Sequence, residues 1–308
     1  MPYVLWKQYG DTDVLKKYLP GMRRYAKFMQ NRCGKWYPTA KRTGLHGKHK
    51  RYLSNYGQAY GEWAEPNDVM AFQWYDFAAP HPEESTAYTY FTLKRVLEAA
   101  EMIEEGKSLE EIKEQLLVRR PHMCQFFTVD DLTKEKFTLD TDRQAKLVRP
   151  LYMGLLTEEQ TKFAEKRLIQ AMEHYGWRLG TGFLSTPLIL DVLAELDISY
   201  AYRLLENEEM PGWLFMPKSG ATTIWEAWEG NTTKDKGIAS LNHYSKGAAC
   251  EWLTNTMCGI RLDGENRFVL APRPGGSITF ARASYQSVYG SVKTDWAETE
   301  TGYRLAVT

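Results

Sequence analysis

The stretch "DRQAKLVRPLYMGLLTEEQTKFAEKRLIQAMEHYG" (142–176) decides the fold class of this 308-residue chain. It divides into two segments, 142–155 and 157–176, in which apolar residues recur at the spacing of an amphipathic helix. The connection between the segments is very short, and Ser or Thr caps and Gly stops recur at segment ends. Helices joined so closely pack in antiparallel pairs. The stretch therefore predicts a helical hairpin.

The same pattern continues on both sides of this hairpin. Helical spacing also marks the segments 11–29, 83–106, 108–117, 186–196, 198–210 and 242–259. Asp11 is placed as an N-cap, and Pro20 is expected to bend or split the helix that follows it. The sequence lacks strand–helix alternation and glycine-rich phosphate loops. These patterns predict a mainly α fold, a toroid of paired helices whose loops converge on a cleft.

The pattern changes near residue 260. Segments such as "SITFARASYQ" (277–286) and "GYRLAVT" (302–308) alternate apolar and polar residues between Gly- and Pro-rich turns, as strands do. We therefore expect a helical domain at 1–258 and a short antiparallel β region, a partial β-sandwich, at 259–308.

Charge and composition exclude several classes of function. Lys plus Arg and Asp plus Glu number 39 each, so the chain lacks the overall charge of a nucleic-acid or anionic-membrane binder. The basic run at 41–51 contains no aromatic stacking residue and is interpreted as a solvated loop. No signal-peptide pattern opens the chain, and no apolar run approaches the roughly 18 residues of a membrane span. We predict a cytoplasmic protein.

The cysteines have no ligand spacing. They are far apart in the chain and form neither a CxxC motif nor a Cys/His metal pattern: Cys33, Cys124, Cys250 and Cys258. The sequence therefore predicts reduced, structural cysteines. We also expect no bound metal and no cofactor.

Two clusters combine tryptophan with acidic residues. In "GATTIWEAWEG" (220–230), Trp225 precedes Glu226 and Trp228 follows shortly after. Taken alone, this run is equally well explained as an aromatic stripe with exposed acids. Cleavage of a glycosidic bond, however, needs two carboxyl groups that flank the bond. Aromatic faces also suit a flat, partly apolar ligand.

The second cluster is "YGQAYGEWAEP" (56–66), within the irregular stretch 31–82. Glu62 follows a glycine and precedes Trp63, and an apolar neighbour disfavours the ionised carboxylate, as a general acid requires. Glu65 and Asp68 are its rivals. A third element, "SLNHYSKG" (240–247), carries His243, which would donate to a sugar hydroxyl.

These motifs resemble a known family. The run "PGWLFMPKSGATTIWEAWEG" (211–230) followed by "LNHYSKGA" (241–248) is similar to the catalytic domain of bacterial α-L-rhamnosidases, glycoside hydrolase family 78. The segments "YGEWAEP" (60–66), "STAYTYF" (85–91) and "GTGFLSTPLILDVL" (180–193) also resemble that family, in the family's order. The resemblance covers roughly residues 2–275.

The resemblance implies an (α/α)6 toroid, an inverting mechanism without metal, and terminal α-L-rhamnosyl groups as substrate. It implies that Glu226 is the general base and Glu62 the general acid, with Asn55, Glu65 or Asp68 in neighbouring roles. Trp63, Trp225 and Trp228 would wall the cleft, because the methyl group of rhamnose favours apolar contact, and His243 would hold a ring hydroxyl.

The chain departs from the family pattern in two ways. Family members usually carry β-sandwich domains before the toroid, and the helices counted here fall short of twelve. We therefore expect a toroid that is incomplete at its N-terminus, in a trimmed form or completed by a homo-oligomer partner or another chain. Two alternatives stay open: a toroid glycosidase for glucosyl or uronic substrates, and an inactive carbohydrate-binding fragment.

Overall fold

The computed structural model describes residues 1–35, 51–54, 60–70, 81–103, 137–230, 239–263 and 267–308, with isolated positions between 110 and 128. Its helices are α1 (Pro2–Tyr9), α2 (Thr12–Arg32), α3 (Pro82–Glu101), α5 (Gln144–Met153), α6 (Glu158–His174), α7 (Thr186–Leu196), α8 (Ile198–Leu205), α9 (Phe215–Lys218) and α10 (Ala249–Trp252). A short 3-10 helix, η3 (Ser245–Ala248), precedes α10, and a π-helical turn, η4 (Leu253–Met257), follows it.

The predicted hairpin at 142–176 is confirmed. Gly154 ends α5 in the left-handed conformation, with φ 67°, which a glycine adopts without steric cost. Thr157 and Gln160 then form a capping box at the start of α6, and α5 packs against α6. The next pair, α7 and α8, is joined at Asp197, whose carboxylate accepts from the backbone N–H of Ser199.

The first long helix excludes one of the two effects expected of Pro20. Asp11 caps α2 as predicted, since its carboxylate accepts from the backbone N–H of Val14 at 3.0 Å. Pro20 does not split the helix, which continues from Thr12 to Arg32. Pro20 is exposed, so water can bond the carbonyl that a buried proline would leave without a partner.

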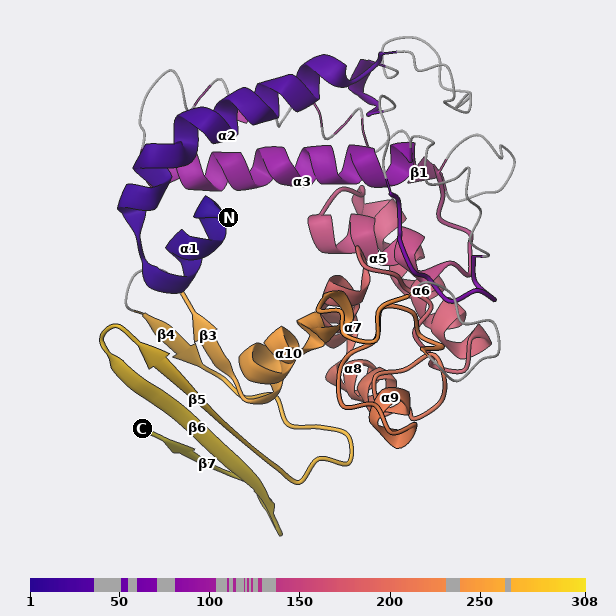
Figure 1. Ribbon diagram of the computed structural model, residues 1–308, viewed down its shortest axis with the longest axis vertical. Helices are drawn as coiled ribbons and strands as arrows, with labels where there is room; N and C mark the ends of the chain where they lie inside the picture. Colours follow the sequence, from indigo (N-terminus) through magenta and orange to yellow (C-terminus); the bar gives the residue numbers. More distant parts are fainter. Residues whose placement is uncertain are drawn as a thin grey trace.

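The helices are arranged around a broad arc. Figure 1 shows α2 and α3 side by side at one end of the molecule, with α5 to α8 along one flank and α10 next to strands β3 and β4. One apolar core joins α3 to the helices from α5 onward, while a second core holds α1, α2 and α3 together, with Trp6, Leu15, Leu19 and Val96 among its members. The fold is the mainly α architecture predicted.

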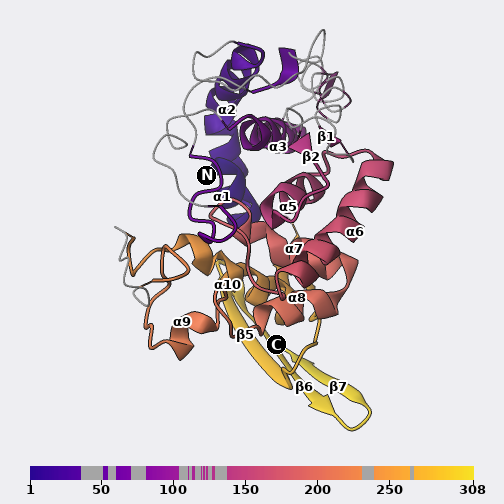
Figure 2. The same ribbon diagram turned by 90° about the vertical axis from the view of Figure 1, so that its right-hand side faces the viewer.

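Strands follow the helices, as expected. The strands β3 (Ile260–Leu262) and β4 (Phe268–Leu270) form an antiparallel pair, and β5 (Phe280–Ser287), β6 (Gly290–Thr299) and β7 (Gly302–Val307) form a three-stranded antiparallel sheet in that order. A two-residue parallel pair, β1 (Phe127–Thr128) and β2 (Phe137–Thr138), lies beside α3 and α5. Figure 2 shows the large sheet at the end of the molecule opposite α2.

Trp296 attaches this sheet to the helices. Its ring is 1% exposed, and its indole N–H donates to the carbonyl of Met257 at 2.8 Å. Thr294 donates to the carbonyl of Cys258 in the same way, so β6 is tied to the end of η4. The β region thus packs on the helical domain through buried, hydrogen-bonded side chains.

Two further predictions concern the cysteines and membrane-spanning segments. Cys33, Cys250 and Cys258 are free thiols, and Cys124 lies outside the described residues, as does most of the basic run at 41–51. Within the described ranges, no helix combines the length and the apolar composition that crossing a bilayer requires.

Candidate active site

Glu226 is the partly exposed carboxylate on which three segments converge. Its backbone N–H donates to the carbonyl of Ser240 at 2.9 Å, and its Oε2 accepts from the backbone N–H of Ser240 at 2.8 Å. Its Oε1 accepts from the indole N–H of Trp63 at 3.2 Å. Both oxygens are thus held by donors from other loops while the residue keeps access to solvent. The sequence predicted Glu226 and Trp63 in one site, and the structure brings them together.

The loop that carries Trp63 rests on the segment before α7. The carbonyl of Trp63 accepts from the backbone N–H of Phe183 at 2.8 Å. A Cβ atom added to Gly182 would lie 2.2 Å from this same carbonyl, so only glycine permits the approach. Ala64, next in the loop, has a left-handed φ of 57°. The main chain at Trp63 is therefore fixed by backbone contacts, and its ring is held by Glu226 and Tyr60.

His243 also lies at this place in the fold. Its backbone N–H donates to the carbonyl of Ile224, two residues before Glu226. Its ring stacks on Phe183 with centroids 4.8 Å apart, and Tyr244 stacks on it in turn at 5.4 Å. Tyr244 is 87% exposed, and Tyr60, which packs edge-on against Trp63, is 61% exposed. Exposed aromatic rings therefore accompany the Glu226 carboxylate.

Two predicted cleft residues belong to the core instead. Trp225 is 3% exposed and Trp228 is 0% exposed, so neither ring faces an open surface. Trp225 packs edge-on against Phe215, and Gly230 lies directly against its ring. The indole N–H of Trp228 donates to the carbonyl of Thr181 at 2.9 Å. Both rings pack in the core next to Glu226 in the chain, and of the three candidates only Trp63 is partly exposed.

Glu62 is the residue for which the structure departs most from expectation. Its side chain is 0% exposed and ion-paired to the equally buried Arg149. Its Oε1 accepts from the backbone N–H groups of Gly182 at 3.0 Å and Ser185 at 2.7 Å, and its Oε2 accepts from Ser185 Oγ at 2.8 Å. The sequence predicted a carboxyl group that faces the cleft. In the structure this group is enclosed by donors and points into the protein.

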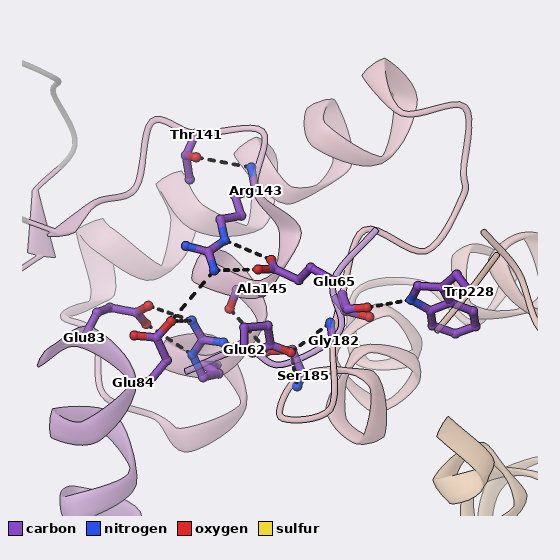
Figure 3. A network of polar contacts seen from close by, with 12 residues as sticks. Glu62, Glu65, Glu83, Glu84, Thr141, Arg143, Ala145, Gly182, Ser185 and Trp228 are labelled. Atoms are coloured by element: carbon purple, nitrogen blue, oxygen red, sulfur yellow. Dashed lines mark hydrogen bonds and ion pairs between the residues drawn. The ribbon is translucent and has the colours of Figure 1, made fainter. Parts of the chain in front are cut away.

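Glu62 is part of a larger buried network, shown in Figure 3. Arg149 also pairs with Glu83 at 2.6 Å and with Glu84 at 3.3 Å. Beside it, Arg143 makes a two-pronged contact with Glu65, at 2.8 and 2.5 Å. Four carboxyl groups thus face two guanidinium groups, and the network joins the loop at 60–66 to α3 and α5.

This excess of carboxyl groups affects their protonation. Burial raises the pKa values of Glu62, Glu65 and Glu83, although the neighbouring arginines act to lower them. Burial alone would also raise the pKa of Glu84, but Arg149 and Arg143 hold it below its ordinary value. A raised pKa suits a general acid, yet an enclosed carboxyl group cannot reach a substrate. The raised pKa therefore does not by itself make Glu62 the acid.

The rivals of Glu62 take different positions. Glu65 is 1% exposed and bound by Arg143, so it is enclosed like Glu62. Asp68 is exposed and accepts from the hydroxyl of Tyr175 at 2.6 Å. Asn55 lies outside the described residues. Within the described part of the chain, no three His, Cys, Asp or Glu side chains gather as metal ligands.

Sequence reasoning missed the residues that hold the acid cluster in place. Arg149 lies in a helix whose apolar spacing was recognised, and nothing in that spacing distinguishes a buried arginine from a solvated one. Ser185 was quoted in a family motif without a role. Phe183, which stacks on His243, was likewise part of that motif only.

Comparison with known proteins places these residues in a family. Residues 1–257 match the family model described as the bacterial α-L-rhamnosidase 6 hairpin glycosidase domain, and residues 263–308 match the bacterial α-L-rhamnosidase C-terminal domain. An α-L-rhamnosidase of Streptomyces avermitilis is 29% identical over 314 residues, which cover 99% of this chain and 27% of that protein. One from an Alteromonas species is 26% identical, over 100% of this chain and 32% of its own length.

Solved structures of α-L-rhamnosidases have a similar fold. A crystal structure of the Streptomyces avermitilis α-L-rhamnosidase complexed with L-rhamnose has a TM-score of 0.79 at 28% identity, covering 100% of this chain and 27% of that one. An α-L-rhamnosidase structure from Dictyoglumus thermophilum also reaches 0.79, and its 21% identity supports the fold alone. The chain spans about a third or less of the length of these relatives.

Proposed function

The chain belongs to the bacterial α-L-rhamnosidase family, and from this premise we propose that it hydrolyses terminal α-L-rhamnosyl groups from rhamnosides. The observation that carries the proposal is the geometry of Glu226. It is a partly exposed carboxylate whose two oxygens are held by Trp63 and Ser240, beside exposed aromatic rings. A carboxylate held in this way, with access to water, is the arrangement that a general base requires.

In the proposed reaction, Glu226 takes a proton from water. The water oxygen attacks the anomeric carbon on the face opposite the leaving group, the glycosidic C–O bond breaks, and the leaving oxygen takes a proton from solvent water. The configuration at the anomeric carbon is inverted, and no metal takes part. The hydrogen bond from Trp63 keeps Glu226 oriented while the proton moves.

Glu62 is not the donor of the second proton in this proposal. Glu62 was the acid implied by the sequence, but its carboxyl group accepts three hydrogen bonds besides the ion pair to Arg149. We propose that Glu62 fixes the backbone on which Trp63 is mounted, so that it acts through Trp63 on Glu226. A leaving-group comparison separates this role from that of an acid.

His243 is the proposed contact for a sugar hydroxyl. Its Nδ1 accepts from the backbone N–H of Ser245 at 3.4 Å, which leaves the proton on Nε2. The stacking contacts with Phe183 and Tyr244 hold the ring, and Nε2 is the atom that would donate to a ligand. The exposed ring faces of Tyr60 and Tyr244 suit the apolar side of a 6-deoxy sugar.

The second candidate function is carbohydrate binding without turnover. It is favoured by one observation: the acid expected on the 60–66 loop is enclosed, while the rings of Tyr60 and Tyr244 are exposed. Hydrolysis of an aryl α-L-rhamnoside, measured beside calorimetric binding of L-rhamnose, tests both. Turnover that is lost in Glu226→Gln supports hydrolysis. Binding without turnover supports the second function. If the chain neither hydrolyses the glycoside nor binds L-rhamnose, both proposed functions are contradicted.

A further inference from the structure

Lys246 is a buried amine next to the candidate active site. Its side chain is 0% exposed, and its Nζ lies 3.8 Å from the centroid of the Trp228 ring. Within the described residues, Nζ has no hydrogen-bond partner. The carbonyl of Lys246 accepts from the indole N–H of Trp213 at 2.9 Å, and Trp213 packs edge-on against Trp228. The amine is therefore buried against the ring of Trp228 and does not reach solvent.

Such a group is costly for the fold. A buried amine without a hydrogen bond loses its hydration and regains only part of it from the face of an indole ring. An apolar side chain of the same length would fill the space without that loss. Stability alone therefore does not account for a lysine at this position, and groups that destabilise the fold are characteristic of functional sites.

The charges around Lys246 come from the active-site loops. The carboxyl groups that act on it are those of Glu229, Glu226 and Glu62, in decreasing order. Trp228, whose ring it faces, lies in the same short segment as Glu226 and Glu229. Lys246 itself lies three residues after His243. Lys246 is thus within electrostatic reach of the proposed base, of Glu229 and of the acid cluster.

We propose that Lys246 is a positioning residue of the active site, whose amine packs on the ring of Trp228 and thereby holds the segment that carries Glu226 and Glu229. This inference rests on the proposed role of Glu226 as a base. Burial lowers the pKa of Lys246 well below its ordinary value, and the three carboxylates act to raise it. The charge of the amine and the charges of the carboxyl groups therefore depend on one another.

The activity test compares Lys246→Met with Lys162→Met, a lysine on the surface of α6. Lys246→Met should unfold at the same temperature as the wild type or higher, because it removes an unpartnered buried amine. Its kcat/KM on an aryl α-L-rhamnoside should fall by about tenfold or more, and the acid limb of the pH profile should move to higher pH. Lys162→Met should change neither. A wild-type rate and pH profile in Lys246→Met, or a lower rate with an unmoved profile, would overturn the proposal.

A second measurement does not depend on turnover. The titration of Lys246 is followed by NMR of the lysine ε-carbon in the wild type and in Glu226→Gln. The midpoint should fall in Glu226→Gln, because a carboxylate that favours the ammonium has been removed. An unchanged midpoint would contradict the coupling. If the wild-type protein showed no turnover, the proposed function would be contradicted. This titration would still show whether Lys246 is coupled to Glu226.

Discussion

Trp63 and Glu226 lie 163 residues apart in the sequence and are joined by a hydrogen bond of 3.2 Å from the indole N–H to Oε1. The bond connects the irregular loop at 60–66 to the loop at 220–230. Because Ser240 holds the other oxygen, the orientation of Glu226 depends on two segments outside its own. A change in either segment should therefore reach the proposed base.

Replacing Glu226 by Gln should abolish hydrolysis and leave sugar binding largely intact. The amide keeps the shape of the carboxylate but cannot take a proton from water, so kcat should fall by about 10²- to 10⁴-fold. The measurement is turnover of an aryl α-L-rhamnoside together with calorimetry of L-rhamnose. Glu158→Gln, an exposed acid on α6, serves as the control. Turnover near the wild-type rate in Glu226→Gln would remove Glu226 from the mechanism.

Trp63→Phe should keep an aromatic ring and lose the donor to Glu226. A hydrogen bond to a charged group contributes about 1.5–3 kcal/mol, and at 3.2 Å the lower end applies, so kcat/KM should fall about tenfold. The matched control is Trp296→Phe, which also loses an indole hydrogen bond, but in β6. That variant should unfold at a lower temperature with unchanged kcat. Equal kinetics in both variants would show that the bond to Glu226 has no catalytic effect.

The role of Glu62 is tested by varying the leaving group. If Glu62 positions Trp63, then Glu62→Gln should lose similar factors on a natural rhamnoside and on a nitrophenyl rhamnoside. A general acid would instead matter far more for the poorer leaving group. Ser185→Ala, which removes one donor to Glu62, should give a smaller loss with the same equal ratio. A much larger loss on the natural rhamnoside would restore Glu62 as the acid.

Arg149→Met should destabilise the fold strongly. It removes the cation shared by Glu62, Glu83 and Glu84 and leaves these carboxyl groups buried together, at a cost of about 3–5 kcal/mol. The loss in free energy of unfolding should grow as pH rises, because more of the crowded carboxyl groups would then have to be ionised. Chemical denaturation at several pH values measures it. The exposed Arg203→Met is the control, and a deficit independent of pH would contradict the electrostatic explanation.

Asp191 on α7 should give the wild-type protein a separate pH dependence. Burial, with Glu251 and Glu195, raises its pKa to about 6. A carboxyl group whose pKa is raised by folding stabilises the protein below its unfolded pKa and loses that contribution as pH rises through the folded value. Stability should therefore fall by roughly 1–2 kcal/mol between about pH 4 and pH 6, after allowance for partial exposure. Asp191→Asn should remove this fall, and an unchanged curve would disprove the assignment.

The helical hairpins were readable from the sequence because their cause is local. Apolar spacing in 142–176, the cap at Asp11 and the stops at glycines are properties of neighbouring residues, and α2, α5 and α6 form where they predict. Whether Pro20 would split its helix was not readable. Whether a proline interrupts a helix depends on its exposure, and packing sets exposure.

The sequence by itself also placed Glu226, Trp63 and His243 among the candidates, because their motifs are compact and chemically specific. Only the tertiary structure decided which neighbours of these residues face a ligand. Trp225 and Trp228 are buried while Trp63 is not, and Glu62 points into the protein toward Arg149. The direction of a side chain depends on which segment packs against it, and those segments lie far away in the chain. Spacing along the sequence carries no record of such contacts, so burial and ion pairing could only be read from the fold.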